Sequence, residues 1–291
     1  MLIHLVDGTY ELFRAFYGAP SSRLSNGQEV AATRTLLRSF AGFLAEPDVT
    51  HVAVAFDTVI ESFRNQLFAG YKTGEGIDPA LHSQFPLAER ASRALGLVTW
   101  SMIDFEADDA IATFAVRAAR DPAVSQVRIC SPDKDFCQTV QGTRVVIYDR
   151  KKKLVTDEQG AIARLGVKPA QVPAYLALVG DTADGIPGLK GWGEKGTAKV
   201  LGHFGSLAAI PRDKSWDLAL RGAESLRGVL QQAGELPALY ETLATLRYDV
   251  PLPEAVADLA FRGPDMVALK ELCTELGSPE LIDGLRLKTA G

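Results

Sequence analysis

Four carboxylates lie within six consecutive positions, in the stretch DFEADD at residues 104–109. Apolar residues at helical spacing follow at once, from Ala110 through Ala118, so the acids are predicted to begin an amphipathic helix. An acidic helix start has a plain structural explanation, because the helix dipole favours negative charge at its N-terminus. If these acids instead meet other acids in the fold, bound cations must hold them together.

Further acids stand where other predicted strands or helices end. They are Asp7, Asp57, Asp133, Asp135, Asp181 and Asp184. Two like charges about 4 Å apart repel by roughly 4 kcal/mol at an effective dielectric of 20, so a shared site would need cations. Carboxylates and water are the ligands of Mg²⁺ and Mn²⁺. Two such ions about 3.5–4 Å apart clamp the attacking and leaving oxygens of a phosphoryl displacement. The acids therefore indicate two-ion phosphodiester hydrolysis.

Other chemistries find less support in the sequence. A glycosidase would need only one carboxylate pair. A P-loop enzyme would need Gly-x-x-x-x-Gly-Lys-Ser/Thr, which is absent. The three cysteines show no metal-ligand spacing and are expected to be reduced, and the four histidines are scattered.

The helices and strands that must position the acids are predicted to form an α/β fold with a mainly parallel central sheet flanked by helices. Buried strands are predicted at 2–6, 52–56, 97–102, 127–130 and 145–148, with helical patterns between them, as at 31–45. Ligands bind beyond the carboxyl ends of the strands in such sheets. Each of the first four strands is followed by acid, so the acids are expected to share one site.

The length, apolar runs and net charge of the chain limit its domain number, its location and its binding partners. At 291 residues the chain exceeds the usual size of a single core, so one large and one smaller domain are expected. No apolar run approaches the roughly eighteen residues that span a bilayer, and the first residues lack a basic flank, which predicts a cytoplasmic protein without a membrane partner. The net charge of −5 argues weakly against nucleic acid. That argument fails where the acids bind metal ions, because bound cations change the local charge.

Two stretches could contact nucleic acid or be ordinary solvated loops. Residues 61–77 are glycine-rich in their second half, and Arg64, Tyr71 and Lys72 offer charges and a stacking ring. Helical patterning resumes at 78–96, with a kink or break expected at Pro86. The second stretch is the basic cluster at 150–153, predicted to be a hairpin turn.

From about residue 160 the pattern is helical, and a glycine-rich hairpin interrupts it. A helix is predicted at 172–179, and a second helix runs through Leu201. A glycine-rich turn that leads into a helix points backbone N–H groups outward, which suits a phosphate. Leu189 before the glycines and Lys195 after them favour a helix-hairpin-helix DNA-binding motif near 172–202. The rest of the chain is mostly helical.

Together these pieces resemble the flap endonuclease and 5′-nuclease family, and most of all the 5′→3′ exonuclease domain at the N-terminus of bacterial DNA polymerase I. The matching motifs, in order, are VDG at 6–8, FD at 56–57, FR at 63–64, YK at 71–72, EADD at 106–109, DKD at 133–135, GDTADGIPG at 180–188, GWGEK at 191–195 and DVPL at 249–252. The resemblance implies a PIN-like nuclease core at 1–165, with a helical arch near 61–96, and a helical region at 166–291. The chain would be a free-standing nuclease or an excised domain.

The resemblance also implies roles for individual residues. It places a first ion among Asp7, Asp57, Glu106 and Asp108, and a second among Asp108, Asp133, Asp135 and Asp184, with Asp109 and Asp181 holding waters or neighbours. It places Lys72 at the scissile phosphate, with Arg64 and Tyr71 positioning the nucleotide. The hairpin at Gly191 and Gly193 would grip the duplex backbone, helped by Lys190, Lys195 and Lys199, and could hold K⁺ through carbonyl oxygens.

The sequence departs from the family pattern at four positions, which are Glu75, Pro132, Gly185 and Gly196. None of them removes an implied metal ligand, so activity is expected. The function predicted is that of a monomeric, metal-dependent, structure-specific 5′ nuclease for DNA replication or repair. The alternatives are a non-catalytic DNA-binding module of the same fold and a PIN-type ribonuclease.

Overall fold

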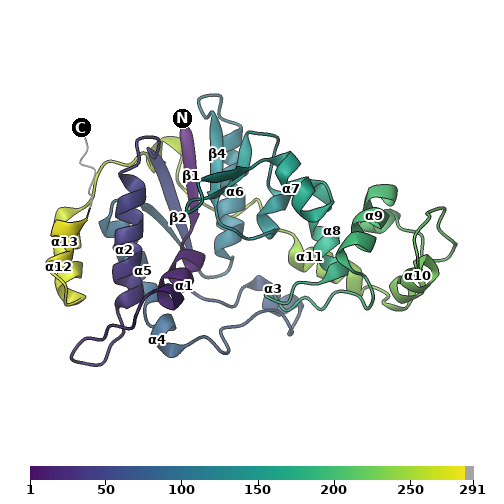
Figure 1. Cartoon of the computed structure of the whole chain (residues 1–291), viewed down its shortest axis with the longest axis horizontal. Helices are drawn as coiled ribbons and strands as arrows, with labels where there is room; N and C mark the ends of the chain where they lie inside the picture. The colour runs from purple at the N-terminus through teal and green to yellow at the C-terminus, as the bar shows by residue number, and fades with distance from the viewer. Residues whose placement is uncertain (286–291) are drawn as a thin grey trace. The chain divides into compact units, whose positions relative to one another are not determined.

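The computed structural model describes residues 1–285, and the chain within it forms two compact units (Figure 1). Unit 1 contains residues 1–60, 74–131 and those from 248 onward, and unit 2 contains 61–73 and 132–247. Each unit is thus built from separated stretches of sequence. The single boundary at residue 165 stays a prediction.

Unit 1 is built on a parallel sheet with the strand order β3-β2-β1-β4. Its strands are β1 (Leu2–Asp7), β2 (His51–Asp57), β3 (Val98–Met102) and β4 (Gln126–Cys130). The near-continuous apolar runs of β1 and β2 are buried because helices cover both faces of the sheet. The register pairs Asp7 with Ala55 and Asp57 with Met102, so the two aspartates end neighbouring strands at one edge. The predicted parallel α/β architecture is confirmed.

The helices of unit 1 pack on this sheet or on one another. They are α1 (Gly8–Gly18), α2 (Ala31–Leu44), α4 (Pro79–His82), α5 (Phe85–Ala94), α6 (Ala107–Ala119), α12 (Met266–Glu275) and α13 (Leu281–Gly284), with a 3-10 turn at Val256–Leu259. Leu36, Leu37 and Phe40 of α2 are buried in the core, as their helical spacing predicts. Pro86 lies in the first turn of α5, where its missing N–H costs nothing, and the predicted break falls at residues 83–84, between α4 and α5.

Unit 2 joins a two-stranded hairpin to a set of helices. Strands β5 (Val145–Asp149) and β6 (Leu154–Thr156) pair antiparallel around the basic turn at 150–153. The helices are α3 (Phe63–Leu67), α7 (Glu158–Leu165), α8 (Val172–Val179), α9 (Glu194–Phe204), α10 (Ala223–Gln232) and α11 (Leu236–Ala244), with 3-10 turns at Asp135–Gln138, Pro169–Gln171 and Leu207–Ala209. Helix α8 is apolar nearly all round and packs against α11.

The stretch expected to form a helical arch, 61–96, is not one helical element. It contains α3 in unit 2, a segment without helix from 68 to 78, and then α4 and α5 in unit 1. Phe85, Leu87 and Ala88 of α5 are buried in the packed core, so α5 is part of the scaffold. Among the described residues, no helix combines the length and the apolar character that crossing a membrane requires.

Candidate functional site

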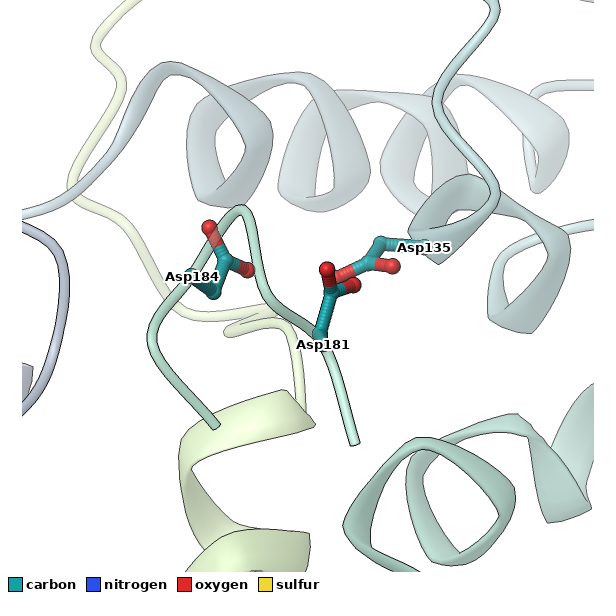
Figure 2. Close-up of side chains that lie close together, drawn as sticks. All are labelled: Asp135, Asp181 and Asp184. Atoms are coloured by element: carbon teal, nitrogen blue, oxygen red, sulfur yellow. The ribbon is translucent and has the colours of Figure 1, made fainter. Parts of the chain in front are cut away.

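Three aspartates of unit 2 form the candidate metal centre, here named the Asp135 cluster. Asp135, Asp181 and Asp184 each offer one carboxylate oxygen, and these oxygens all lie within 4.8 Å of one another. Figure 2 shows the three side chains close together, with those of Asp181 and Asp184 rising from one turn toward Asp135. Asp135 begins the 3-10 turn that follows the DKD motif, and the other two stand in the turn after α8. The family resemblance implied a second ion among Asp108, Asp133, Asp135 and Asp184, with Asp181 nearby, and these ligand roles stay a prediction.

Backbone pairing shapes the turn that carries two of these acids. Asp181 and Ile186 exchange both backbone hydrogen bonds, each at 2.8 Å, and the four residues between them form a tight loop. Gly185 in that loop has a φ of +73°, which L side chains rarely adopt. A Cβ atom at this position would also lie 2.3 Å from the Gly70 carbonyl oxygen. Gly185, one of the four departures from the family pattern, therefore permits a close backbone approach.

Asp135 is the most buried acid of the cluster, with 5% of its surface exposed. Its Oδ1 atom is buried and, among the described residues, has no hydrogen-bond partner. Burial raises the pKa of this carboxyl well above its usual value, and the neighbouring Asp133, Asp184 and Asp181 carboxylates raise it further, while Lys134 opposes them. A buried acid with an orphaned oxygen beside two other acids fits a hard cation, which would satisfy that oxygen and offset the repulsion.

Two lysines contact the cluster from different segments. The Lys134 ammonium forms an ion pair with Asp181. The Lys72 ammonium lies 3.1 Å from Asp184 Oδ1, and the Lys72 backbone N–H donates to the Asp184 carbonyl oxygen at 3.0 Å. Lys72, the residue expected at the scissile phosphate, is thus held beside the acids. Lys134 was not among the predicted site residues, although its place between two acids in DKD was a usable signal.

Asp133 is the exposed member of the DKD motif. Its Oδ1 atom accepts a hydrogen bond from the Asp135 backbone N–H at 2.9 Å, which shapes the turn that presents Asp135. Asp133 therefore supports the position of the buried acid, and its role as an ion ligand stays a prediction.

Arg64 and Tyr71 differ from the expectation that they face a nucleotide. Arg64 is 1% exposed and Tyr71 is 3% exposed. The Arg64 guanidinium donates from Nε to the Leu243 carbonyl oxygen at 2.8 Å and from Nη2 to that of Thr245 at 2.9 Å. It thereby fastens α3 to the end of α11. Its partners lie about 180 positions away in sequence, so the local pattern at 61–77 could not predict its burial.

The acids implied for the first ion belong to unit 1 and stand at the carboxyl edge of its parallel strands. Asp7 is buried and accepts hydrogen bonds from the Tyr10 backbone N–H at 2.8 Å and from Ser131 Oγ at 2.9 Å. Asp57 Oδ1 accepts from the Ala107 backbone N–H at 2.7 Å. Each carboxylate is therefore oriented by the start of a helix, α1 for Asp7 and α6 for Asp57.

The EADD motif begins α6, as predicted. Glu106 is the N-cap residue and is buried, whereas Asp108 in the first turn is half-buried. Asp109 is fully buried, and its Oδ2 accepts from the Glu106 backbone N–H at 3.1 Å. Asp109 thus has the capping role that acidic helix starts commonly serve, which leaves Glu106 and Asp108 as the better ligand candidates of this motif.

The glycine-rich hairpin before α9 is the candidate DNA surface. Gly193 is the N-cap residue of α9, with an ordinary φ of −90°, and nothing lies within 4 Å of the point where a Cβ atom would stand. Lys190 and Lys195 are exposed beside it, while the Lys199 ammonium donates to the Ala219 carbonyl oxygen. Arg221, which was not among the predicted DNA-binding residues, lines a cavity of about 570 Å³ together with residues of the 191–196 stretch and the start of α10.

Two protein-family models together match most of the chain. Residues 2–166 match the 5′-3′ exonuclease N-terminal resolvase-like domain, and residues 167–267 match the 5′-3′ exonuclease C-terminal SAM fold. The chain belongs to the 5′-3′ exonuclease family, whose members hydrolyse DNA, and the predicted family is confirmed.

Curated relatives include both long polymerases and a short exonuclease. The chain is 32% identical over 289 residues to DNA polymerase I of Bacillus caldotenax, which covers 96% of this chain and 32% of the polymerase. It is 30% identical over 282 residues to a 5′-3′ exonuclease of Aquifex aeolicus, covering 96% of this chain and 93% of that protein. The chain therefore spans about a third of the polymerase and nearly all of the Aquifex exonuclease.

Solved structures share the fold at low sequence identity. The zinc-bound 5′-exonuclease of bacteriophage T5 superposes with a TM-score of 0.67 at 18% identity, covering 95% of this chain and 98% of the T5 chain. The catalytic core of Rad2 in complex with DNA gives 0.60 at 15% identity, covering 97% and 91%. These likenesses confirm the mainly parallel nuclease core with a helical C-terminal region.

Proposed function

We propose that this chain is a structure-specific 5′ nuclease that hydrolyses DNA phosphodiester bonds at 5′ ends and 5′ flaps and leaves a 5′-phosphate. The observation that carries the proposal is the Asp135 cluster, in which Asp135 lies beside two further acids and has a buried carboxylate oxygen without a hydrogen-bond partner among the described residues. Family membership supplies the reaction class. The T5 nuclease, which shares the fold, has been solved with divalent metal ions and with DNA, and this supports the cofactor and the substrate.

Two Mg²⁺ or Mn²⁺ ions are proposed as the cofactors. The ligands proposed for the second ion are Asp133, Asp135, Asp181 and Asp184, and those for the first are Asp7, Asp57, Glu106 and Asp108, with Asp109 as a supporting acid. Bound divalent cations at such a site lower the pKa of a water molecule and offset the charge of the transition state. The chain's carboxylates fix the coordination, and their helix-start and turn hydrogen bonds keep them in place.

Lys72 is proposed to stabilise negative charge on the reacting phosphate. Its ammonium contacts the Asp135 cluster, and it comes from the glycine-rich segment. A cation placed where charge develops acts more on the transition state than on the bound substrate. Arg64 and Tyr71 are proposed to act behind Lys72, since their buried side chains fix the base of its segment.

The hairpin before α9 is proposed to grip the backbone of the duplex. The backbone at Gly191 and Gly193 carries no side chain and can approach phosphates closely, and Lys190, Lys195 and Lys199 add positive charge. Carbonyl oxygens of the same hairpin are proposed to hold K⁺. Contacts of this kind carry no base information, so binding should be sequence-independent and should weaken with salt.

A cytoplasmic monomer is also proposed, with the catalytic acids mainly in residues 1–165 and the duplex-binding hairpin in 166–291. Size-exclusion chromatography with light scattering tests the monomer, and a mass of twice the chain would refute it.

The decisive assay uses a 5′-flap duplex labelled at its 5′ end, with Mg²⁺, with Mn²⁺, and with EDTA. Cleavage near the flap base that requires a divalent ion supports the proposal. Asp135→Asn should lose most of that cleavage while binding the duplex normally. A matched flap made of RNA tests the ribonuclease alternative. Binding without cleavage of either substrate would leave a DNA-binding module and would refute the enzyme.

A further inference from the structure

The Asp135 cluster is already neutralised in part by the protein itself. Three carboxylates within 4.8 Å of one another would repel strongly, yet two of them are paired with ammonium groups, Asp181 with Lys134 and Asp184 with Lys72. Asp135, by contrast, has a buried oxygen that finds no hydrogen-bond partner among the described residues. The ammonium groups of Lys72 and Lys134 thus offset part of the negative charge that a divalent ion would otherwise offset.

The two lysines are attached to the cluster differently. Lys72 belongs to a glycine-rich segment and is the residue proposed to meet the substrate. Lys134 is the N-cap of the 3-10 turn that begins with Asp135, so its backbone is fixed next to the acids. Its side chain is one-third exposed, whereas that of Asp181 is only 6% exposed. The Lys134 side chain therefore has room to turn toward solvent, whereas the Asp181 side chain is held in the cluster by its burial.

We propose that Lys134 is a resident counter-ion of the Asp135 cluster, which holds Asp181 in place before a divalent cation binds and competes with that cation for the Asp181 carboxylate. The inference rests on the proposed function, because it assumes that the cluster takes a divalent ion. Lys134 acts through Asp181 and is a positioning residue, without contact to the reacting atoms.

If Lys134 competes with the divalent ion for the Asp181 carboxylate, removing the Lys134 ammonium should lower protein stability but raise ion affinity. Without divalent ions, removing the ammonium leaves like charges unbalanced, so the protein should become less stable. With divalent ions, the Asp181 carboxylate becomes fully available, so the ions should bind more tightly. A lysine that only anchored the fold would change stability without tightening ion binding.

The experiment measures Mn²⁺ binding to the full chain by electron paramagnetic resonance, without DNA. The Mn²⁺ class that belongs to the cluster is the one that Asp135→Asn removes. Lys134→Met should lower the dissociation constant of that class by about tenfold, a size reduced from the full Coulomb attraction because Lys134 is partly exposed. Lys134→Arg keeps the charge and should bind Mn²⁺ like the wild type. Lys214→Met, which removes an exposed lysine elsewhere in unit 2, is the matched control.

Thermal unfolding followed by circular dichroism supplies the second readout. In EDTA, Lys134→Met should have a lower melting temperature than the wild type. Adding Mn²⁺ should raise the melting temperature of this variant by more than it raises that of the wild type. Should that variant not fold in EDTA, Lys134→Gln, which keeps a hydrogen-bond donor to Asp181, is measured instead. An unchanged dissociation constant in both neutral variants overturns the inference, as does equal tightening in Lys134→Arg or Lys214→Met. If the wild type has no Mn²⁺ class that Asp135→Asn removes, the proposed metal centre itself fails.

Discussion

Lys72 is joined to Asp184 twice, through its ammonium at 3.1 Å from Oδ1 and through its backbone N–H at 3.0 Å from the carbonyl oxygen. The backbone bond fixes where the segment runs, and the ion pair fixes where the charge points. A third contact supports both, since Gly185 leaves room for the Gly70 carbonyl oxygen. The residue proposed for the phosphate is therefore positioned by the turn that carries the acids.

Gly185→Ala should damage this arrangement. The added Cβ would meet the Gly70 carbonyl oxygen at 2.3 Å and would also strain a φ of +73°. We expect a stability loss of about 1–3 kcal/mol from the strained backbone, and a cleavage rate that falls further than stability alone explains. Urea unfolding and single-turnover cleavage measure the two effects. Gly205→Ala is the control, because its φ of +87° is similar and nothing lies within 4 Å. Equal cleavage by both variants would contradict the positioning role.

Lys72→Ala should slow the chemical step more than it weakens binding. The lost ammonium is proposed to act on charge that develops in the transition state, so a drop of roughly 10²–10³-fold in the single-turnover rate is expected. Measuring the single-turnover cleavage rate at saturating enzyme separates the rate of the chemical step from the dissociation constant for DNA. An unchanged rate with weaker binding would make Lys72 a binding residue only.

Asp135→Asn should stabilise the ion-free protein at neutral pH. The raised pKa of Asp135, caused first by burial and then by Asp133, Asp184 and Asp181, means that the folded state holds the proton more tightly than the unfolded state. Its stabilising contribution is thus full below the ordinary aspartate pKa and is lost as the pH rises through the raised value. The advantage of the asparagine variant should therefore shrink as the pH falls toward about 4. Thermal melts in EDTA across this range test the sign, and a growing advantage at low pH would refute it.

Gly193→Val should weaken duplex binding across sequences while the protein stays folded. The position has an ordinary φ and no neighbour within 4 Å, so a side chain fits the protein but would stand where a phosphate is proposed to approach. Affinity for the flap duplex, measured at several salt concentrations, should fall, and cleavage of a short single-stranded 5′ end should suffer less. Gly202→Val, at another open position on α9, controls for helix propensity. Unaltered flap affinity would make the hairpin a structural turn only.

Cys137 should resist thiol reagents in the folded protein. Burial is the main cause that raises the pKa of its thiol to about 11, and it outweighs the opposing effect of the Arg164 guanidinium. Almost no thiolate is then present at pH 8. Titration with a thiol-specific chromophore in buffer and in denaturant tests this, and rapid labelling of the native protein at Cys137 would contradict it.

The sequence predicted those features that local pattern determines. The ends of β1 and β2, the start of α6 and the bounds of α8 follow from apolar runs and periodicity, so the acids at those ends could be placed in advance. The burial of Arg64 could not, because the carbonyl oxygens of Leu243 and Thr245 come from a distant helix end. The pairing of Lys134 with Asp181 likewise depends on two segments that only the fold brings together.

The division of unit 1 among three stretches has a consequence during synthesis. Residues beyond 248 complete this unit: the Leu252 carbonyl oxygen accepts from Arg117 at 2.8 Å, and the Phe261 N–H donates to the Thr50 carbonyl oxygen at 2.8 Å. A nascent chain that has emerged only through α9 possesses all four parallel strands and yet lacks these partners. The apolar surface that residues from 248 cover stays exposed until that stretch has left the ribosome, and a chain with such exposed surface is open to aggregation or to a chaperone.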